Sequence, residues 1–207
     1  MNNLILARAV AIVVTVILLS ACSSSPPKNP DDLCDVFEEK RDWYKASKDA
    51  SDRWGAPIQV PMAIMYQESA FKAKAQPPMR WFLGFIPYGR ASSAYGYSQA
   101  KKGAWSDYQR ETGNGWSDRD DFEDAVDFVQ WYIDKTKKIN GVSKWDTYNQ
   151  YLAYHEGNGG FKRRTYNSKP WLKKVAKKVD ARAKMYGAQY SRCKTSLDRN
   201  WFMRLFF

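Results

Sequence analysis

The sequence has very few of the residues from which metal sites are built. Among its 207 residues there is a single histidine, His155, and there are three cysteines, Cys22, Cys34 and Cys193. One histidine without a cluster of cysteines or aspartates does not form a metal ligand shell, so we expect no metal and no cofactor. Strand signals are scarce as well, and no internal repeat is present, which favours a small and mostly helical domain.

The N-terminal residues have the pattern of a bacterial lipoprotein signal. An apolar run over 9–19 follows a short positive segment and is short for a membrane span. Residues 19–22, Leu-Ser-Ala-Cys, then resemble a lipobox, in which the cysteine is acylated and becomes the new N-terminus. We therefore predict a signal peptide over 1–21, lipidation of Cys22 and a tether over 22–31, with an uncleaved anchor helix as the alternative.

The other two cysteines, Cys34 and Cys193, lie near the two ends of the expected folded part. Export would place them in a compartment that permits disulfides. A bridge between them would close almost the whole domain and tie its ends together. Two free thiols are the alternative that the sequence leaves open.

Several segments have the apolar spacing or the end signals of helices. We predict helices over 32–53, 61–71, 121–133, 145–154 and 171–186. A long connection over 76–94, rich in proline, glycine and aromatic residues, interrupts them, and a loop of this length is often functional. These segments favour one mainly α domain with a central cleft over 32–195, followed by an apolar-basic tail over 196–207.

Glu68 stands out because it shares a helical face with apolar residues. Ile64, Met65 and Phe71 lie three or four positions away from it, which places them on its side of a helix. Burial disfavours the charged form of a carboxyl group and raises its pKa, so Glu68 would stay protonated near neutral pH and could act as a general acid. The alternative is a glutamate near a helix end that is solvated or paired with a lysine.

Three segments, in the order in which they occur, resemble the motifs of the soluble lytic transglycosylase (SLT) family, whose fold is that of goose-type lysozyme. Glu68-Ser69 is similar to the ES motif, residues 96–99 (Gly-Tyr-Ser-Gln) to the GLMQ motif, and residues 151–157 (Tyr-Leu-Ala-Tyr-His-Glu-Gly) to the AYNAG segment. The second and third motifs each depart from the family pattern at two central positions, which leaves subsite shape and sugar preference open.

The resemblance implies a lysozyme-like fold and a peptidoglycan lytic transglycosylase that cleaves the MurNAc-GlcNAc β-1,4 bond. Glu68 would act first as acid and then as base, while the C6 hydroxyl of muramic acid attacks its own anomeric carbon to give 1,6-anhydro-MurNAc. The substrate-binding residues implied by the motifs are Ser69, Gly96, Tyr97, Ser98, Gln99, Tyr154, His155 and Glu156. Among them, Gly96 would let the backbone approach the sugar, and Gln99 and Tyr154 would supply hydrogen bonds.

Two other functions stay open. Glu156, as a second carboxylate, could position a water molecule and make the protein a hydrolytic goose-type muramidase. Without catalysis, the same fold could belong to a peptidoglycan-binding lipoprotein that organises an envelope machine. His155 is a candidate pH-sensitive partner of Glu68, or it replaces the asparagine of the family as a hydrogen-bonding residue.

The expected partners follow from export and from charge. With 33 Lys and Arg against 22 Asp and Glu, the formal net charge is +11, and a basic surface attracts polyanions. Nucleic acid is a poor candidate for an exported lipoprotein. We therefore expect peptidoglycan glycan strands, a membrane through the N-terminal lipid anchor, and an envelope-machine protein as partners. Ser23 in place of Asp after Cys22 favours the outer membrane, facing the periplasm.

Large apolar residues are concentrated in the connection that precedes the 96–99 motif. They are Trp81, Phe82, Phe85, Ile86 and Tyr88. In the family fold they would emerge beside the cleft, and a large exposed apolar patch is rare on a monomer. They could pack on the domain, stack on sugar rings, or dock a partner or a membrane. We favour stacking, because aromatic faces suit the apolar faces of pyranose rings.

Overall fold

The computed structural model describes the backbone of residues 25–206 and the side chains of residues 25–199. The predicted signal peptide (1–21), the lipidation site Cys22 and the side chains of the apolar tail from Trp201 onwards therefore lie outside the described part. Within that part, no helix is both long enough and apolar enough to cross a membrane.

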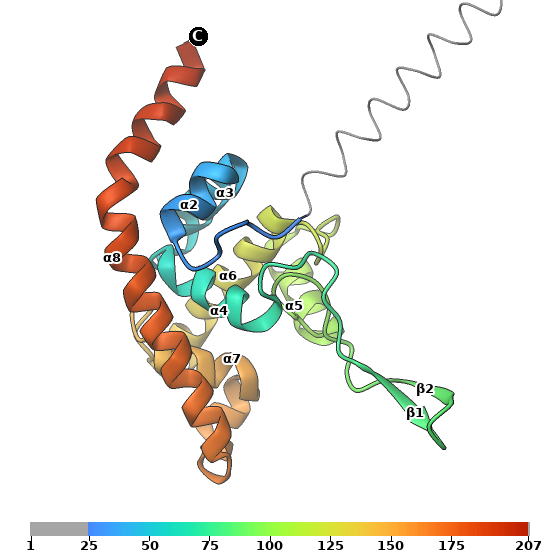
Figure 1. The fold of residues 1–207 in the computed structure, drawn as a ribbon. Coiled ribbons are helices and arrows are strands. Elements are labelled where there is room, and N and C mark those ends of the chain that lie inside the picture. The colour runs from blue at the N-terminus through green and yellow to red at the C-terminus, as the bar shows by residue number, and fades with distance from the viewer. Residues whose placement is uncertain (1–24, 207) are drawn as a thin grey trace, which may run out of the picture.

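Helices make up most of the described chain (Figure 1), which confirms the prediction of a mainly α fold. Along the chain the elements are α2 (Leu33–Glu39), α3 (Arg41–Trp54), α4 (Gln59–Ser69), β1 (Met79–Phe82), β2 (Ile86–Arg90), α5 (Lys102–Thr112), α6 (Phe122–Asn140), α7 (Thr147–Lys162), the 3-10 turn η1 (Thr165–Ser168) and α8 (Pro170–Phe206). The two short strands pair with each other and form a two-stranded sheet.

The core is centred on α4, which is covered by other helices. Its residues from Val60 to Met65 are buried without interruption, because α8 and α6 both pack against it. A helix that is apolar on all sides is stable only when neighbours enclose it in this way. The packing leaves the last turn of α4, which carries Glu68, at the edge of the core.

The long helix α8 runs along one side of the molecule (Figure 1) and ties together elements from both halves of the chain. It packs against α2, α4 and α7. Near its C-terminal part, a disulfide joins Cys193 to Cys34 on α2. The first and last described helices are therefore linked covalently as well as by packing.

The end of the predicted tether over 22–31 is also held by α8. Arg182 forms an ion pair with Asp31 at 2.8 Å, and the hydroxyl of Tyr186 donates a hydrogen bond to the carbonyl of Pro30. The last residues of that segment are thus bound to the domain, which shortens the stretch that can act as a free linker.

The predicted helix over 32–53 is divided into two at Lys40, whose backbone (φ −116°, ψ 73°) is not helical. The break changes the direction of the chain and lets Phe37 of α2 pack against Tyr44 of α3, with ring centroids 5.2 Å apart. In one continuous helix, residues seven positions apart would be separated by about 10 Å along the axis. The period of apolar residues predicts helical structure on both sides of Lys40, but it does not reveal the break between the two helices.

The helix that carries Glu68 differs from the prediction over 61–71 at both ends. It begins at Gln59, because a proline such as Pro61 is tolerated in a first turn, where its missing N–H is not needed. It ends at Ser69, because Ala70 and Phe71 both have positive φ, 50° and 60°. The later predicted helices are present but longer, as α6, α7 and α8, and α5 was not predicted.

The connection over 76–94 contains a β-hairpin, which the sequence analysis missed. Strands β1 and β2 pair antiparallel, with a bulge between Arg80 and Trp81. Three residues, 83–85, connect the strands, and the N–H of Phe85 donates to the carbonyl of Phe82 at 3.3 Å. Leu83 and Gly84, the two central residues of this turn, both have positive φ, 53° and 80°. Figure 1 shows the hairpin projecting from the helical body as an arm. Its residues are exposed throughout, so its apolar side chains do not pack against the helices of the described chain.

Candidate active site

Glu68 lies in the last turn of α4, one residue before the helix ends. The hydroxyl of Ser69 donates to the carbonyl of Met65 at 3.2 Å and to that of Tyr97 at 2.7 Å. The second of these bonds ties the end of α4 to the 96–99 segment, which is remote in sequence. Ala70 closes the helix in a left-handed conformation. These contacts hold Glu68 at a defined place on the surface of the core.

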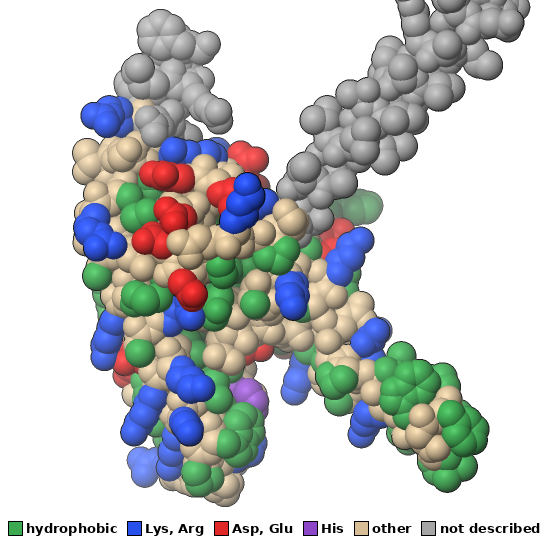
Figure 2. Space-filling model, in the orientation of Figure 1, with side chains coloured by type: hydrophobic (Ala, Val, Ile, Leu, Met, Phe, Trp, Pro, Cys, Tyr) green, Lys and Arg blue, Asp and Glu red, His purple; other side chains and the backbone are tan. Residues whose placement is uncertain are grey.

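A cavity of about 430 Å³ opens at Glu68. Its wall brings together five residues predicted from the sequence, Glu68, Gln99, Tyr154, His155 and Glu156. Aromatic residues of α6, residues at the base of the hairpin and residues at the start of α5 also contribute to the lining. On the face drawn in Figure 2, the surface is hollowed between the α7–α8 end of the body and the hairpin arm. The motifs near 68, 99 and 155 therefore meet at one site.

The pKa of Glu68 is displaced toward neutrality. The residue is half-buried, and burial raises the pKa of its carboxyl group to about 7, although a hydrogen bond from the hydroxyl of Tyr151 lowers it in part. Tyr151 lies on α7 and is itself buried. Near neutral pH both the protonated and the ionised forms of Glu68 are populated, so one side chain can donate a proton and later accept one.

Comparison with protein families matches the family model described as "Transglycosylase SLT domain" to residues 10–193. The chain belongs to this SLT family. The match confirms the family that the three motifs indicated and, together with the mainly helical architecture, a lysozyme-like SLT domain. Membership points to a glycan-cleaving enzyme of the transglycosylase type. A search of curated proteins gives no match.

Four residues that the motifs implied as substrate-binding do not line the cavity of this SLT domain. They are Ser69, Gly96, Tyr97 and Ser98. Tyr97 is 2% exposed and packs edge-on against Trp43, with ring centroids 5.5 Å apart. Ser98 is fully buried. Residues 96–98 are buried in the core, so they pack behind the cavity wall and do not form its surface.

The expected role of Gly96 in approaching the sugar is not what the structure shows. Its φ is 80°, and a Cβ atom at this position would lie 1.9 Å from the backbone oxygen of Arg119. The neighbouring N–H of Tyr97 donates to the same carbonyl at 3.2 Å. The close approach that requires glycine is therefore between two segments of the SLT domain itself.

Hydrogen bonds within the domain fix the two polar residues that do reach the cavity. The hydroxyl of Tyr154 donates to the carbonyl of Ser98 at 2.6 Å. The side-chain amide of Gln99 donates to the carbonyls of Ala75 and Gly96, each at 2.9 Å. Both side chains are thus held in place without substrate, and such preorganisation reduces the cost of ordering them on binding.

Glu156 is surrounded by donors. Its carboxylate accepts hydrogen bonds from Lys169 at 2.7 Å, from Thr165 and from Nδ1 of His155 at 3.1 Å, and its side chain is only 3% exposed. Burial by itself would raise the pKa of Glu156, but the bonds from Lys169, Thr165 and His155 prevail and lower it to about 2. Glu156 is therefore ionised at neutral pH and is a weak base.

His155 does not partner Glu68. Its Nδ1 lies 3.1 Å from Glu156, and its ring stands edge-on to that of Trp171, with centroids 5.3 Å apart. His155 is exposed and lies on the cavity wall. The hydrogen-bonding role is thus the one that the geometry fits, and its partner within the described chain is an adjacent carboxylate.

Two residues at this site were missed by sequence reasoning. Tyr151 precedes Tyr154 by three positions, so the helical period already placed both phenols on one face of α7, and that signal could have identified Tyr151. Lys169 follows Glu156 across a kink at Gly157 and the turn η1. No periodicity connects these two residues, and only the fold brings them together. Among the described residues, no group of three His, Cys, Asp or Glu side chains could hold a metal ion.

Proposed function

We propose that this SLT domain protein is a peptidoglycan lytic transglycosylase that cleaves the β-1,4 bond between MurNAc and GlcNAc and leaves a 1,6-anhydro-MurNAc end. One observation carries the proposal. Of the two carboxyl groups that line the cavity, Glu156 has a pKa of about 2, whereas Glu68 has a pKa of about 7 and a hydrogen bond from the phenol of Tyr151. That protonation behaviour suits a reaction in which one group must serve as acid and then as base.

The reaction would proceed in two proton transfers through Glu68. The protonated carboxyl group donates its proton to the glycosidic oxygen as the bond to the muramic acid anomeric carbon breaks. The resulting carboxylate then accepts the proton of the C6 hydroxyl while that oxygen bonds to the anomeric carbon. The proton returns to Glu68, and no water is consumed. Tyr151 would stabilise the carboxylate between the two steps, because a hydrogen bond to the charged form favours it.

The environment of Glu156 favours this reaction over hydrolysis. An inverting hydrolase needs a second carboxylate that accepts a proton from water on the opposite face of the sugar. Glu156 is the candidate for that task, but its pKa of about 2 makes it a poor proton acceptor. Lys169, Thr165 and His155 also occupy its oxygens. Its ion pairs instead support a structural part in the cavity wall.

The products of digested sacculi test the reaction directly. Mass spectrometry of material released by the wild-type chain should show 1,6-anhydromuropeptides, and Glu68→Gln should release them at a rate lower by roughly 10²-fold or more, since the acid is lost. Glu123→Gln is the matched control, because Glu123 is an exposed glutamate on α6 away from the cavity. Reducing-end muropeptides as the main product would mean hydrolysis. No release by the wild type would favour the binding-only function.

We further propose that the enzyme is exported and lipid-anchored through Cys22, at the outer membrane and facing the periplasm. The support is the lipobox-like sequence at 19–22 and the serine that follows it, together with a wall substrate. Labelled palmitate should be incorporated into the wild type but not into Cys22→Ser, and the wild type should fractionate with the outer membrane. Equal labelling of both chains, or confinement to the inner membrane, would contradict the proposal.

A further inference from the structure

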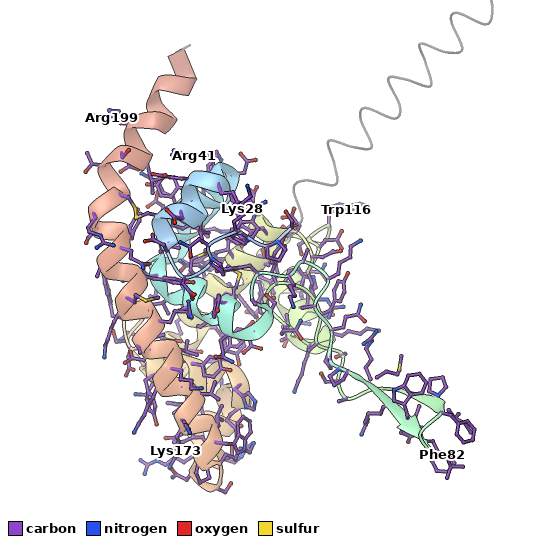
Figure 3. The ribbon with its side chains drawn as sticks, in the orientation of Figure 1. Lys28, Arg41, Phe82, Trp116, Lys173 and Arg199 are labelled. Atoms are coloured by element: carbon purple, nitrogen blue, oxygen red, sulfur yellow. A yellow bond between two sulfur atoms is a disulfide. The ribbon has the colours of Figure 1, made fainter. Side chains whose placement is uncertain are left out.

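The β1–β2 hairpin exposes a group of large apolar side chains that the catalytic proposal does not use. Trp81, Phe82, Leu83, Phe85, Ile86 and Tyr88 are between 44% and 73% exposed. Figure 3 shows Phe82 at the far end of the arm, away from the helical body. A contiguous apolar patch of this kind on a soluble domain marks a surface that another body covers.

The apolar residues occupy both faces of the hairpin and its tip. Trp81 pairs with Pro87 and Phe82 with Ile86, and successive residues of a strand point to opposite faces. The turn between the strands adds Leu83 and Phe85. A sugar ring stacks on one face of an aromatic ring, so a stacking platform needs only one apolar face. Apolar side chains all around a tip are suited to immersion in an apolar medium.

The charges near the hairpin have a single sign. No Asp or Glu occurs between Glu68 and Asp107, whereas the same stretch contains six Lys or Arg. All six are exposed, and they are Lys72, Lys74, Arg80, Arg90, Lys101 and Lys102. Figure 2 shows hydrophobic side chains at the distal end of the arm and basic ones nearer the body. The complement of this surface is apolar at depth and anionic at its boundary.

An anionic lipid bilayer has that layered chemistry. We propose that the hairpin tip inserts into the interface of an anionic membrane, with Leu83 and Phe85 among the acyl chains and Arg80 and Arg90 beside the lipid phosphates. Trp81 lies between these two levels, where tryptophan is favoured in membrane proteins. Interfacial elements of this kind penetrate about 5–10 Å and bind through apolar area and attraction to anionic lipid.

Two contacts hold Arg80 and Arg90 on the part of the hairpin that is nearer the helical body. The guanidinium of Arg90 donates to the carbonyl of Pro77 at 2.6 Å, which closes the base of the hairpin. The guanidinium of Arg80 lies 5.8 Å from the ring centroid of Tyr88. The two guanidinium groups therefore stay near the base of the hairpin, and its uncharged tip can enter the bilayer. Insertion would hold the nearby cavity close to the membrane surface, independently of any lipid on the N-terminus.

A fluorescent probe at the tip of the full chain tests the insertion. An environment-sensitive fluorophore is attached to Phe85→Cys or, as the control, to Trp116→Cys. Trp116 is 98% exposed and lies on the body away from the arm (Figure 3). Both chains also carry Cys22→Ser, so that a single free thiol is labelled while Cys34 and Cys193 remain in their disulfide. Each chain is mixed with vesicles of phosphatidylcholine, with and without phosphatidylglycerol, and separately with lipid-free sacculi.

We expect the probe at position 85 to shift to the blue and to brighten by roughly two-fold or more with phosphatidylglycerol vesicles, with a smaller response to neutral vesicles. The probe at 116 should not respond. Adding Arg80→Glu should weaken the response at 85, whereas Arg110→Glu on α5 should not. A response at 85 to sacculi alone would assign the hairpin to glycan. Equal responses at 85 and 116, equal responses to neutral and anionic vesicles, or no response to any vesicle would overturn the proposal.

Discussion

At the scale of single residues, the chemistry of the site depends on a balance at Glu68. Burial disfavours its carboxylate, while the hydroxyl of Tyr151 favours it, and the result is a pKa of about 7. Neither effect alone would suit a group that must both give and take a proton. Because the proposed reaction requires the acid form of Glu68 in its first step, we expect activity to fall as the pH rises through about 7.

Replacing Tyr151 by Phe removes the hydrogen bond that lowers the pKa of Glu68, so that pKa should rise. The basic limb of the pH–rate profile for sacculus digestion should therefore move to higher pH, while the rate at low pH falls because the carboxylate formed in the reaction loses a donor. Tyr148→Phe, on the same helix but outside the cavity, should leave the profile unchanged. A basic limb that stays in place or moves to lower pH would show that Tyr151 does not act on Glu68.

At the scale of elements, the 96–99 segment acts as a joint between α4, α7 and the loop before α6. Ser69 donates to the carbonyl of Tyr97, Tyr154 donates to that of Ser98, and the N–H of Tyr97 donates to that of Arg119. The segment thus positions the acid on one side and the cavity wall on the other. The family motif at this place is explained largely by backbone geometry.

Gly96→Ala tests that explanation. An added Cβ would meet the Arg119 carbonyl and would also sit at a φ of 80°, so we expect the free energy of unfolding to fall by about 2–4 kcal/mol. Gly103→Ala in α5 is the control, because nothing lies within 4 Å of its Cβ position, and it should be neutral or slightly stabilising. Chemical denaturation measures both. If Gly96→Ala keeps its stability but loses glycan binding, Gly96 contacts the substrate, as the sequence analysis expected.

At the scale of the whole molecule, α8 and the disulfide hold the ends of the domain together. Cys34 and Cys193 are 159 residues apart in sequence, and α8 packs along α2, α4 and α7 between the bridge and the cavity. The bridge encloses all the elements that build the candidate active site. Stability and site geometry therefore depend on the same long-range connection.

Removing the bridge should destabilise the domain strongly. On the chain-entropy model, a closed loop of this length contributes roughly 4–5 kcal/mol, so Cys34→Ser with Cys193→Ser should unfold at a much lower denaturant concentration than the wild type. A reducing agent should lower the midpoint of the wild type and leave that of the double variant unchanged. Cys22→Ser is the control for the loss of a cysteine outside the bridge. Equal midpoints for the wild type and the double variant would contradict this estimate.

The sequence by itself determined the family and the mainly α fold, and it singled out Glu68 as the candidate acid. An apolar helix that carries Glu68 and three motifs in order are local patterns, because helical period and motif spacing are properties of neighbouring residues. The same is true of α6, whose first turn is capped by Asp121.

Only the tertiary structure decided which atoms these local patterns meet. It brought Tyr151 into a hydrogen bond with Glu68, the carbonyl of Arg119 close to Gly96, and Lys169 into a hydrogen bond with Glu156. It also divided the predicted helix over 32–53 at Lys40. The connection over 76–94 contains a hairpin that is exposed, since none of the described helices covers it. The contacts of Tyr151, Arg119 and Lys169 join segments that are separated in sequence, and no local period of apolar residues specifies which segments meet.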